Sequence, residues 1–144
     1  MKPYFDHEKL NVYQVSLAFT EWVGEFLGSV EAKAAAKDQL DRAATSIPLN
    51  VAEGNGKFSK RDRARFFDIA RGSALEAAAS LDVLVSRKLT TKSHVDPPKE
   101  QLVQIVNMLM RLLKGLGYEF GSGIGLMREE PDLEFGFEQE QEKE

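Results

Sequence analysis

The fold of this chain is decided by residues 41–54, which read DRAATSIPLNVAEG. The spacing of the apolar residues predicts a helix, although a proline stands in its middle. A proline inside a helix removes one backbone donor and crowds the carbonyl four residues earlier, at a cost of roughly 3 kcal/mol. We therefore expect Pro48 to be held by tertiary packing rather than by local helix propensity.

A polar row runs along this predicted helix. Its members are spaced by four, four and three residues and so share one face: Arg42, Ser46, Asn50 and Glu53. A neighbouring apolar and small row has the same spacing: Ala43, Ile47, Val51 and Gly54. Together with Arg71 and Glu76, the charged members could form an acid/base cluster or an interhelical network of buried ion pairs and hydrogen bonds. We favour the network, because no nucleophile or cleft accompanies the carboxylates.

Three further helices follow from apolar residues repeated at spacings of three and four. The four predicted helices cover residues 8–30, 36–54, 59–88 and 99–116. No stretch predicts a strand, so the expected fold class is all-α. Because the connections are short, we expect an antiparallel up-and-down four-helix bundle over residues 1–116.

The ends of these helices carry their own signals. Gly54-Asn-Gly56 is expected to close the second helix, because glycine and asparagine tolerate the left-handed conformation. Ser59 is a good N-cap for the third helix. The pair Pro97-Pro98 predicts that residues 92–98 form a loop, with the fourth helix beginning near Lys99.

Composition limits the classes of function. The chain has 144 residues, expected to form one main domain, and no cysteine, which excludes disulfides and thiolate metal sites. The N-terminus lacks the apolar run of a signal peptide, and no apolar stretch has membrane-spanning length, so we expect a cytoplasmic protein. His7 and His94 are the only histidines. We predict no metal site and no cofactor, and place both histidines at the surface.

The net charge of −4 conceals an asymmetry along the chain. Residues 117–144 hold nine acids and two bases, a net charge of −7. The first 116 residues hold 17 bases and 14 acids, a net charge of +3. We interpret residues 117–144 as a flexible, poorly ordered Gly/Glu-rich tail. Such a tail is either a solvated appendage or a competitor for anionic ligands of a basic surface.

Basic residues gather where the third helix should start. Residues 57–71 contain two acids and six bases, the bases being Lys57, Lys60, Arg61, Arg63, Arg65 and Arg71. Bases in a first helical turn oppose the helix dipole and need compensation. The cluster is either a nucleic-acid surface or a solvated helix start with local charge pairs. We take residues Lys57, Lys60, Arg61, Arg63 and Arg65 as the candidate nucleic-acid contacts.

Aromatic residues near this cluster could stack on bases if they were exposed. Helical spacing places Trp22 and Phe67 in the core, whereas Phe66 is ambiguous.

Three strings of residues resemble a known family. They are LDRAATSIPLNVAEG at residues 40–54, RFFDIARGS at residues 65–73 with Glu76, and LNVYQ at residues 10–14. Over roughly residues 8–116 the chain resembles the four-helix bundle family of bacterial 23S rRNA intervening-sequence proteins. The resemblance implies an antiparallel bundle, a ring-shaped homopentamer and no enzymatic activity. The acidic tail lies outside the family pattern.

The resemblance implies two kinds of partner. The family takes its name from reading frames inside inserts of large-subunit rRNA genes. A similar bundle is the accessory protein of diversity-generating retroelements, where it binds the reverse transcriptase and nucleic acid. Our first hypothesis is therefore a homo-oligomer that binds RNA or DNA through the basic cluster. The alternative is an adaptor that binds a protein partner, and an enzyme is the least favoured class.

Overall fold

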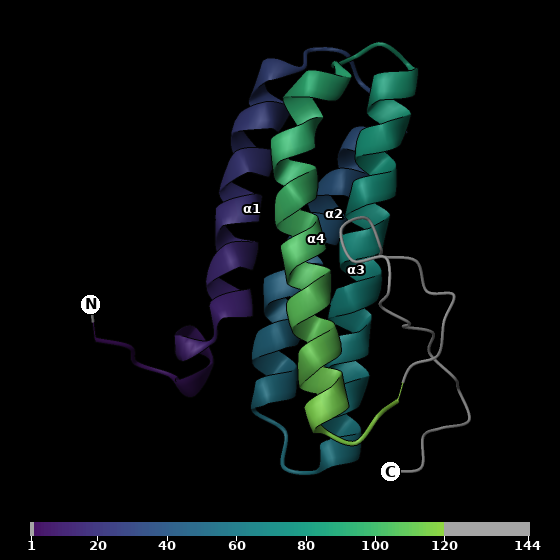
Figure 1. The fold of residues 1–144 in the computed structure, drawn as a ribbon. Helices are drawn as coiled ribbons and strands as arrows, with labels where there is room; N and C mark the ends of the chain where they lie inside the picture. The colour runs from purple at the N-terminus through teal and green to yellow at the C-terminus, as the bar shows by residue number, and fades with distance from the viewer. Residues whose placement is uncertain (1, 120–144) are drawn as a thin grey trace.

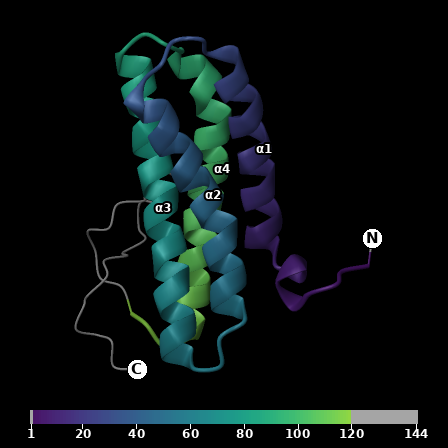
Figure 2. The same cartoon turned by 180° about the vertical axis from the view of Figure 1, so that it is seen from behind.

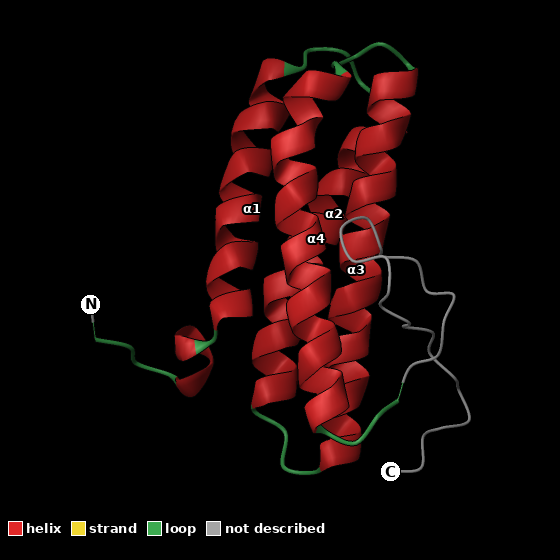
Figure 3. Cartoon of the chain, viewed as in Figure 1, coloured by secondary structure: helices red, strands yellow, loops and turns green. Residues whose placement is uncertain are grey.

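The chain folds into four long helices that run alternately up and down (Figure 1). This computed structural model describes residues 2–119. The 3₁₀ turn η1 (Asp6–Lys9) precedes α1 (Asn11–Ser29), α2 (Ala35–Asn55), α3 (Lys60–Ser86) and α4 (Lys92–Gly115). Within that range no residue is in a strand (Figure 3). The predicted all-α four-helix bundle is confirmed.

Each helix packs against its neighbours in sequence, and α1 also packs against α4, which closes the bundle. The front and back views show this arrangement (Figures 1 and 2). The most extensive contact is between α2 and α3. The helix that contains residues 41–54 therefore forms half of the main helix–helix interface. None of the helices in residues 2–119 has the length and apolar character needed to cross a membrane.

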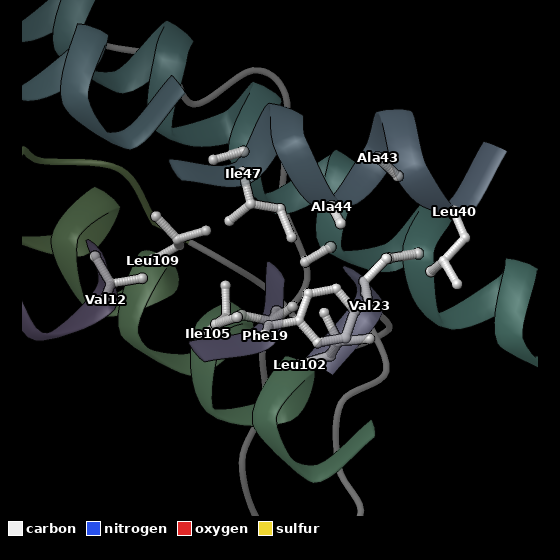
Figure 4. Packing of buried hydrophobic residues seen from close by; sticks show 14 of the residues in the cluster. Val12, Phe19, Val23, Leu40, Ala43, Ala44, Ile47, Leu102, Ile105 and Leu109 are labelled. Carbon is white, nitrogen blue, oxygen red and sulfur yellow. The ribbon is translucent and has the colours of Figure 1, made fainter. Parts of the chain in front are cut away.

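The core lies along the bundle axis, with contributions from all four helices. Phe19 of α1 and Ile47 of α2 are fully buried, and they pack with Ile105 and Leu109 of α4 (Figure 4). The third helix contributes mainly small buried residues, among them Ala70, Ala74 and Ala77. Small side chains let a facing helix approach closely, which accounts for the extensive contact between α2 and α3.

The predicted loop over residues 92–98 is wrong, because α4 begins at Lys92. The hydroxyl of Thr91 accepts a hydrogen bond of 3.2 Å from the His94 N–H and caps the helix. Pro97 and Pro98 lie inside the second turn, where they deprive two carbonyls of their usual donors. Val95 and Pro98 are both buried. Tertiary packing of this turn therefore outweighs the local preference against helix.

The predicted helix over residues 8–30 divides into two parts. It contains the end of η1, an extended Leu10, and then α1. At the other end of the chain, α4 closes on Gly117, whose φ of +103° allows the Tyr118 N–H to bond the Leu113 carbonyl at 3.1 Å. The backbone that closes α4 thus extends two residues past residue 116, the predicted end of the bundle. From residue 120 onward, the predicted acidic tail lies outside the described residues.

Candidate nucleic-acid interface

The predicted basic cluster surrounds the turn between α2 and α3, at the end of the bundle drawn lowest in Figure 1. The turn is short: α2 ends at Asn55, and α3 begins at Lys60 behind the N-cap Ser59. The hydroxyl of Ser59 accepts a hydrogen bond of 3.0 Å from the Asp62 N–H. The predicted N-cap is confirmed, and it fixes where the basic first turn of α3 starts.

Arg63 does not face solvent with the other bases. Its guanidinium donates to the Asn55 carbonyl at 2.8 Å and to the Lys57 carbonyl at 3.3 Å, and it lies 5.9 Å from the centre of the Phe67 ring. The last carbonyls of a helix lack intrahelical donors, and Arg63 supplies one to the end of α2. Arg63 is therefore committed to holding the turn, which leaves four of the five predicted contact residues for a ligand.

Phe66, ambiguous from the sequence, is half-buried beneath two cations. The Lys57 ammonium lies 5.1 Å from the ring centre and the Arg65 guanidinium lies 5.5 Å from it. Lys57 also forms an ion pair of 3.3 Å with Glu53. Cation–π contacts at exposed sites contribute about 0.5–1 kcal/mol each. The Phe66 ring therefore holds Lys57 and Arg65 side by side on the surface.

Lys60 and Arg61 are the two bases of the cluster that have no partner among the residues that the structure describes. Both are exposed in the first turn of α3, and neither forms an ion pair or side-chain hydrogen bond with another residue of the range 2–119. Their positive charge opposes the dipole of α3, and only Asp62 offsets it within that turn. The positive charge at the start of α3 is therefore only partly neutralised within the described chain. A bound anion would be stabilised at this position.

Phe58 was missed by the sequence reasoning. It stands in the turn and is the most exposed large apolar residue of the described chain, with a relative exposure of 103 %. An aromatic residue in the short turn between Gly56 and Ser59, outside any helical stripe, is the signal that could have identified it. We call the group Lys57, Phe58, Lys60, Arg61, Arg65 and Phe66 the turn surface.

The N-terminal segment lies beside this turn. The Asn55 side-chain amide donates a hydrogen bond of 3.0 Å to the Asp6 carboxylate, which joins η1 to the end of α2. This hydrogen bond, together with the nearby charge of Lys9, lowers the pKa of Asp6 below its ordinary value of 3.8. Tyr4 and Phe5 are exposed just before η1. Two more aromatic rings are therefore attached to the bundle end that carries the turn surface.

The polar row of α2 forms one hydrogen bond to α3, so the predicted interhelical link is present, but through uncharged groups. The hydroxyls of Ser46 and Ser73 are 2.7 Å apart. The Asn50 amide donates to the Ser46 carbonyl at 2.8 Å and to its hydroxyl at 2.9 Å. Ser73 is buried, and the sequence reasoning had not assigned it to the network. One hydrogen bond, between Ser46 and Ser73, thus links the two helices, and Asn50 supports it from within α2.

The predicted buried ion pairs among Arg42, Glu53, Arg71 and Glu76 are wrong. Glu53 pairs with Lys57, and Arg71 pairs with Asp68 at 2.9 Å, each within one helix or its end. Arg42 and Glu76 are exposed. Partners three or four residues away let these ions stay in contact with water, whereas a buried interhelical pair would lose that hydration. The charged members of the row therefore do not lock α2 to α3.

Pro48 and Gly54 complete the motif, and both are buried in α2. A Cβ placed on Gly54 would lie 2.9 Å from Cε1 of Phe67 and 3.1 Å from the Arg63 carbonyl oxygen. Gly54 is therefore required for close approach to α3. The predicted left-handed closure is wrong: the C-cap of α2 is Gly56, with φ of −89°, and neither Gly54 nor Gly56 has a positive φ.

The two histidines lie in separate aromatic clusters. His7 stacks on Phe5 at 5.9 Å, whereas the ring of His94 is 5.6 Å from Trp22 and 5.8 Å from Phe26. Across residues 2–119, no three side chains of the types His, Cys, Asp and Glu converge where they could hold a metal ion.

Comparison with known proteins agrees with the motif and the fold. A sequence model of the 23S rRNA-intervening sequence proteins matches residues 8–111. The chain belongs to this family. The fold of this family member is similar to the crystal structure of a protein of unknown function from the S23 ribosomal protein family of Bacteroides thetaiotaomicron. The TM-score is 0.68 at 22 % sequence identity, over 72 % of this chain and 98 % of that one. Comparison with curated proteins returns no match.

Proposed function

We propose that this 23S rRNA-intervening sequence protein is a non-enzymatic, cytoplasmic binding protein that holds RNA, or another nucleic acid, on the turn surface. The observation that carries the proposal is the pair of exposed cations Lys60 and Arg61, which have no partner in the described part of the chain, next to Lys57 and Arg65 on the Phe66 ring. Such a group neutralises phosphates without reading a base sequence. Each phosphate contact steepens the slope of log K against log salt concentration by about 0.9 on duplex and by about 0.7 on single strands.

The test is salt-dependent binding of a structured RNA, measured by fluorescence anisotropy. In one variant Lys60, Arg61 and Arg65 are changed to Glu. In the control variant the same charge change is made at Lys33, Arg42 and Arg87, which are exposed elsewhere on the bundle. We expect the first variant to lose binding and the control to retain most of it. Absence of binding by the unaltered chain at low salt would refute the proposal.

We further propose that the protein is a homo-oligomer, for which the family resemblance implies a pentameric ring. Support comes from apolar residues exposed on the outside of α3, where Ile69, Leu75 and Val83 are 42–45 % exposed. Several copies would multiply weak phosphate contacts through effective concentration. Light scattering coupled to size exclusion measures the assembly directly. A monomer at micromolar concentration would contradict this part of the proposal.

The alternative function is an adaptor for a protein partner, such as a nucleic-acid enzyme. It is favoured by a groove of about 390 Å³ between α3 and α4, beside the exposed Leu75. Its apolar lining includes Ala74, Ala78, Leu102, Val103 and Val106. Affinity purification from the native host, followed by nuclease treatment, separates the two functions. A protein that remains bound after the nucleic acid has been digested would support the adaptor.

A further inference from the structure

Phe58 has a position that its own packing does not explain. The ring is fully exposed, so it contributes nothing to the core. The backbone on both sides of it is nevertheless fixed. On the preceding side, Arg63 holds the carbonyls of Asn55 and Lys57, and on the following side the hydroxyl of Ser59 caps α3. A bulky apolar ring is thus presented to solvent on a braced turn.

The surroundings of this ring are cationic. Lys57 precedes it, Lys60 and Arg61 follow it without partners among residues 2–119, and Arg65 lies one helical turn beyond Arg61. Surfaces that bind single-stranded nucleic acid combine the same two elements, cations along the backbone and aromatic rings on which bases stack. In a duplex the base faces are already stacked on one another, so an exposed ring finds no partner there.

We infer that the turn surface binds unpaired nucleotides in preference to duplex, with Phe58 stacking on a base while Lys60, Arg61 and Arg65 contact the adjacent phosphates. This inference rests on the proposed nucleic-acid function and specifies its substrate class. The braced turn lowers the entropy lost when the ring is immobilised against a base. Tyr4 and Phe5, which the Asp6–Asn55 hydrogen bond keeps at this end of the bundle, extend the set of exposed rings.

The test compares two probes with the full-length chain. One is a labelled RNA single strand of about twelve nucleotides without self-complementarity, and the other is the same strand annealed to its complement. Four proteins are titrated by anisotropy at one low salt concentration: the unaltered chain, Phe58→Ala, Phe58→Tyr and Leu49→Ala. Leu49 is the matched control, because it is a large apolar residue of α2 that is 63 % exposed.

We expect the single strand to be bound more tightly than the duplex. Phe58→Ala should weaken single-strand binding by about fivefold or more and change duplex binding less than twofold, since stacking on one base contributes about 1–3 kcal/mol. Phe58→Tyr should retain most of the affinity, because its ring can still stack, and Leu49→Ala should change nothing. Thermal melts of both alanine variants should match the unaltered chain, as neither side chain is buried.

Three outcomes would overturn the inference, and they are distinguishable from one another. If the unaltered chain binds neither probe, the proposed function fails and the inference fails with it. If both probes are bound equally and Phe58→Ala has no effect, while the variant with Lys60, Arg61 and Arg65 changed to Glu loses binding, only the inference fails. Equal losses on both probes for Phe58→Ala would also contradict it, because stacking requires an unpaired base.

Discussion

At the scale of single residues, Gly54 determines how closely α2 and α3 can pack. We expect Gly54→Ala to destabilise the fold by about 1–3 kcal/mol, because the new methyl group overlaps the buried Phe67 ring and the Arg63 carbonyl. Gly72→Ala is the matched control, since a Cβ there meets nothing within 4 Å, and it should stabilise α3 by up to about 1 kcal/mol. Urea unfolding measures both. Equal effects from the two substitutions would contradict this role of Gly54.

Asp6 provides a pH dependence at the same scale. Its folded pKa is lowered by the Asn55 hydrogen bond and by Lys9, so the link between η1 and α2 is at full strength above the ordinary pKa of 3.8. The link is lost as pH falls through the lower folded pKa. We expect the chemical shift of the Asp6 carboxyl carbon, followed by NMR against pH, to give a pKa below 3.8. In Asn55→Ala this pKa should lie closer to 3.8. A midpoint unchanged by that substitution would show that Asn55 is not the cause.

At the scale of helices, α3 and α4 end in the same backbone motif with different residues. In each, the second residue after the C-cap donates back across the last turn: Leu89 to the Leu84 carbonyl, and Tyr118 to the Leu113 carbonyl. The left-handed position is Gly117 in α4 but Lys88 in α3, where φ is 63°. A side chain in that conformation costs roughly 1–2 kcal/mol.

We therefore expect Lys88→Gly to stabilise the protein by about 0.5–1 kcal/mol, after the larger chain entropy of an unfolded glycine is subtracted. Gly117→Ala should destabilise it by about 1 kcal/mol. The control is Ser86→Gly in the last turn of α3, which should also destabilise, since glycine is a poor helix former. All three are measured by urea unfolding. A loss of stability in Lys88→Gly would show that its side chain makes a compensating contribution.

The helices themselves could be predicted from the sequence because their apolar period is long and regular. The hydrogen bond between α2 and α3 was predicted in part, since Ser46 lies on the polar face that it shares with Asn50. Its partner Ser73 lies on the other helix, and that pairing depends on the register of the two helices. The start of α4 was not predictable from Pro97 and Pro98, because burial of the turn outweighs their local cost. The inward role of Arg63 was not predictable either, because its hydrogen bond to the Asn55 carbonyl results from the path of the α2–α3 turn.

At the scale of the whole molecule, the charge distribution bears on the proposed function. The turn surface is positive, whereas residues 117–144 carry a net charge of −7. The helix α4, after which this acidic segment follows, ends at the same end of the bundle as the turn surface (Figure 1). A tethered anion near a basic surface lowers the local concentration of a second anion, and salt screens this effect.

We expect the full-length variant with Glu138, Glu140, Glu142 and Glu144 changed to Gln to bind nucleic acid roughly 3- to 10-fold more tightly at about 50 mM salt. The gain should disappear near 1 M salt, where the Debye length is about 3 Å. The control variant removes four negative charges from the bundle itself, at Glu21, Glu25, Glu31 and Asp38, all exposed. Equal gains in both variants would assign the effect to net charge alone. Both variants carry the same total charge. A gain confined to the tail variant would therefore mean that the tail competes with nucleic acid through its position as well as its charge.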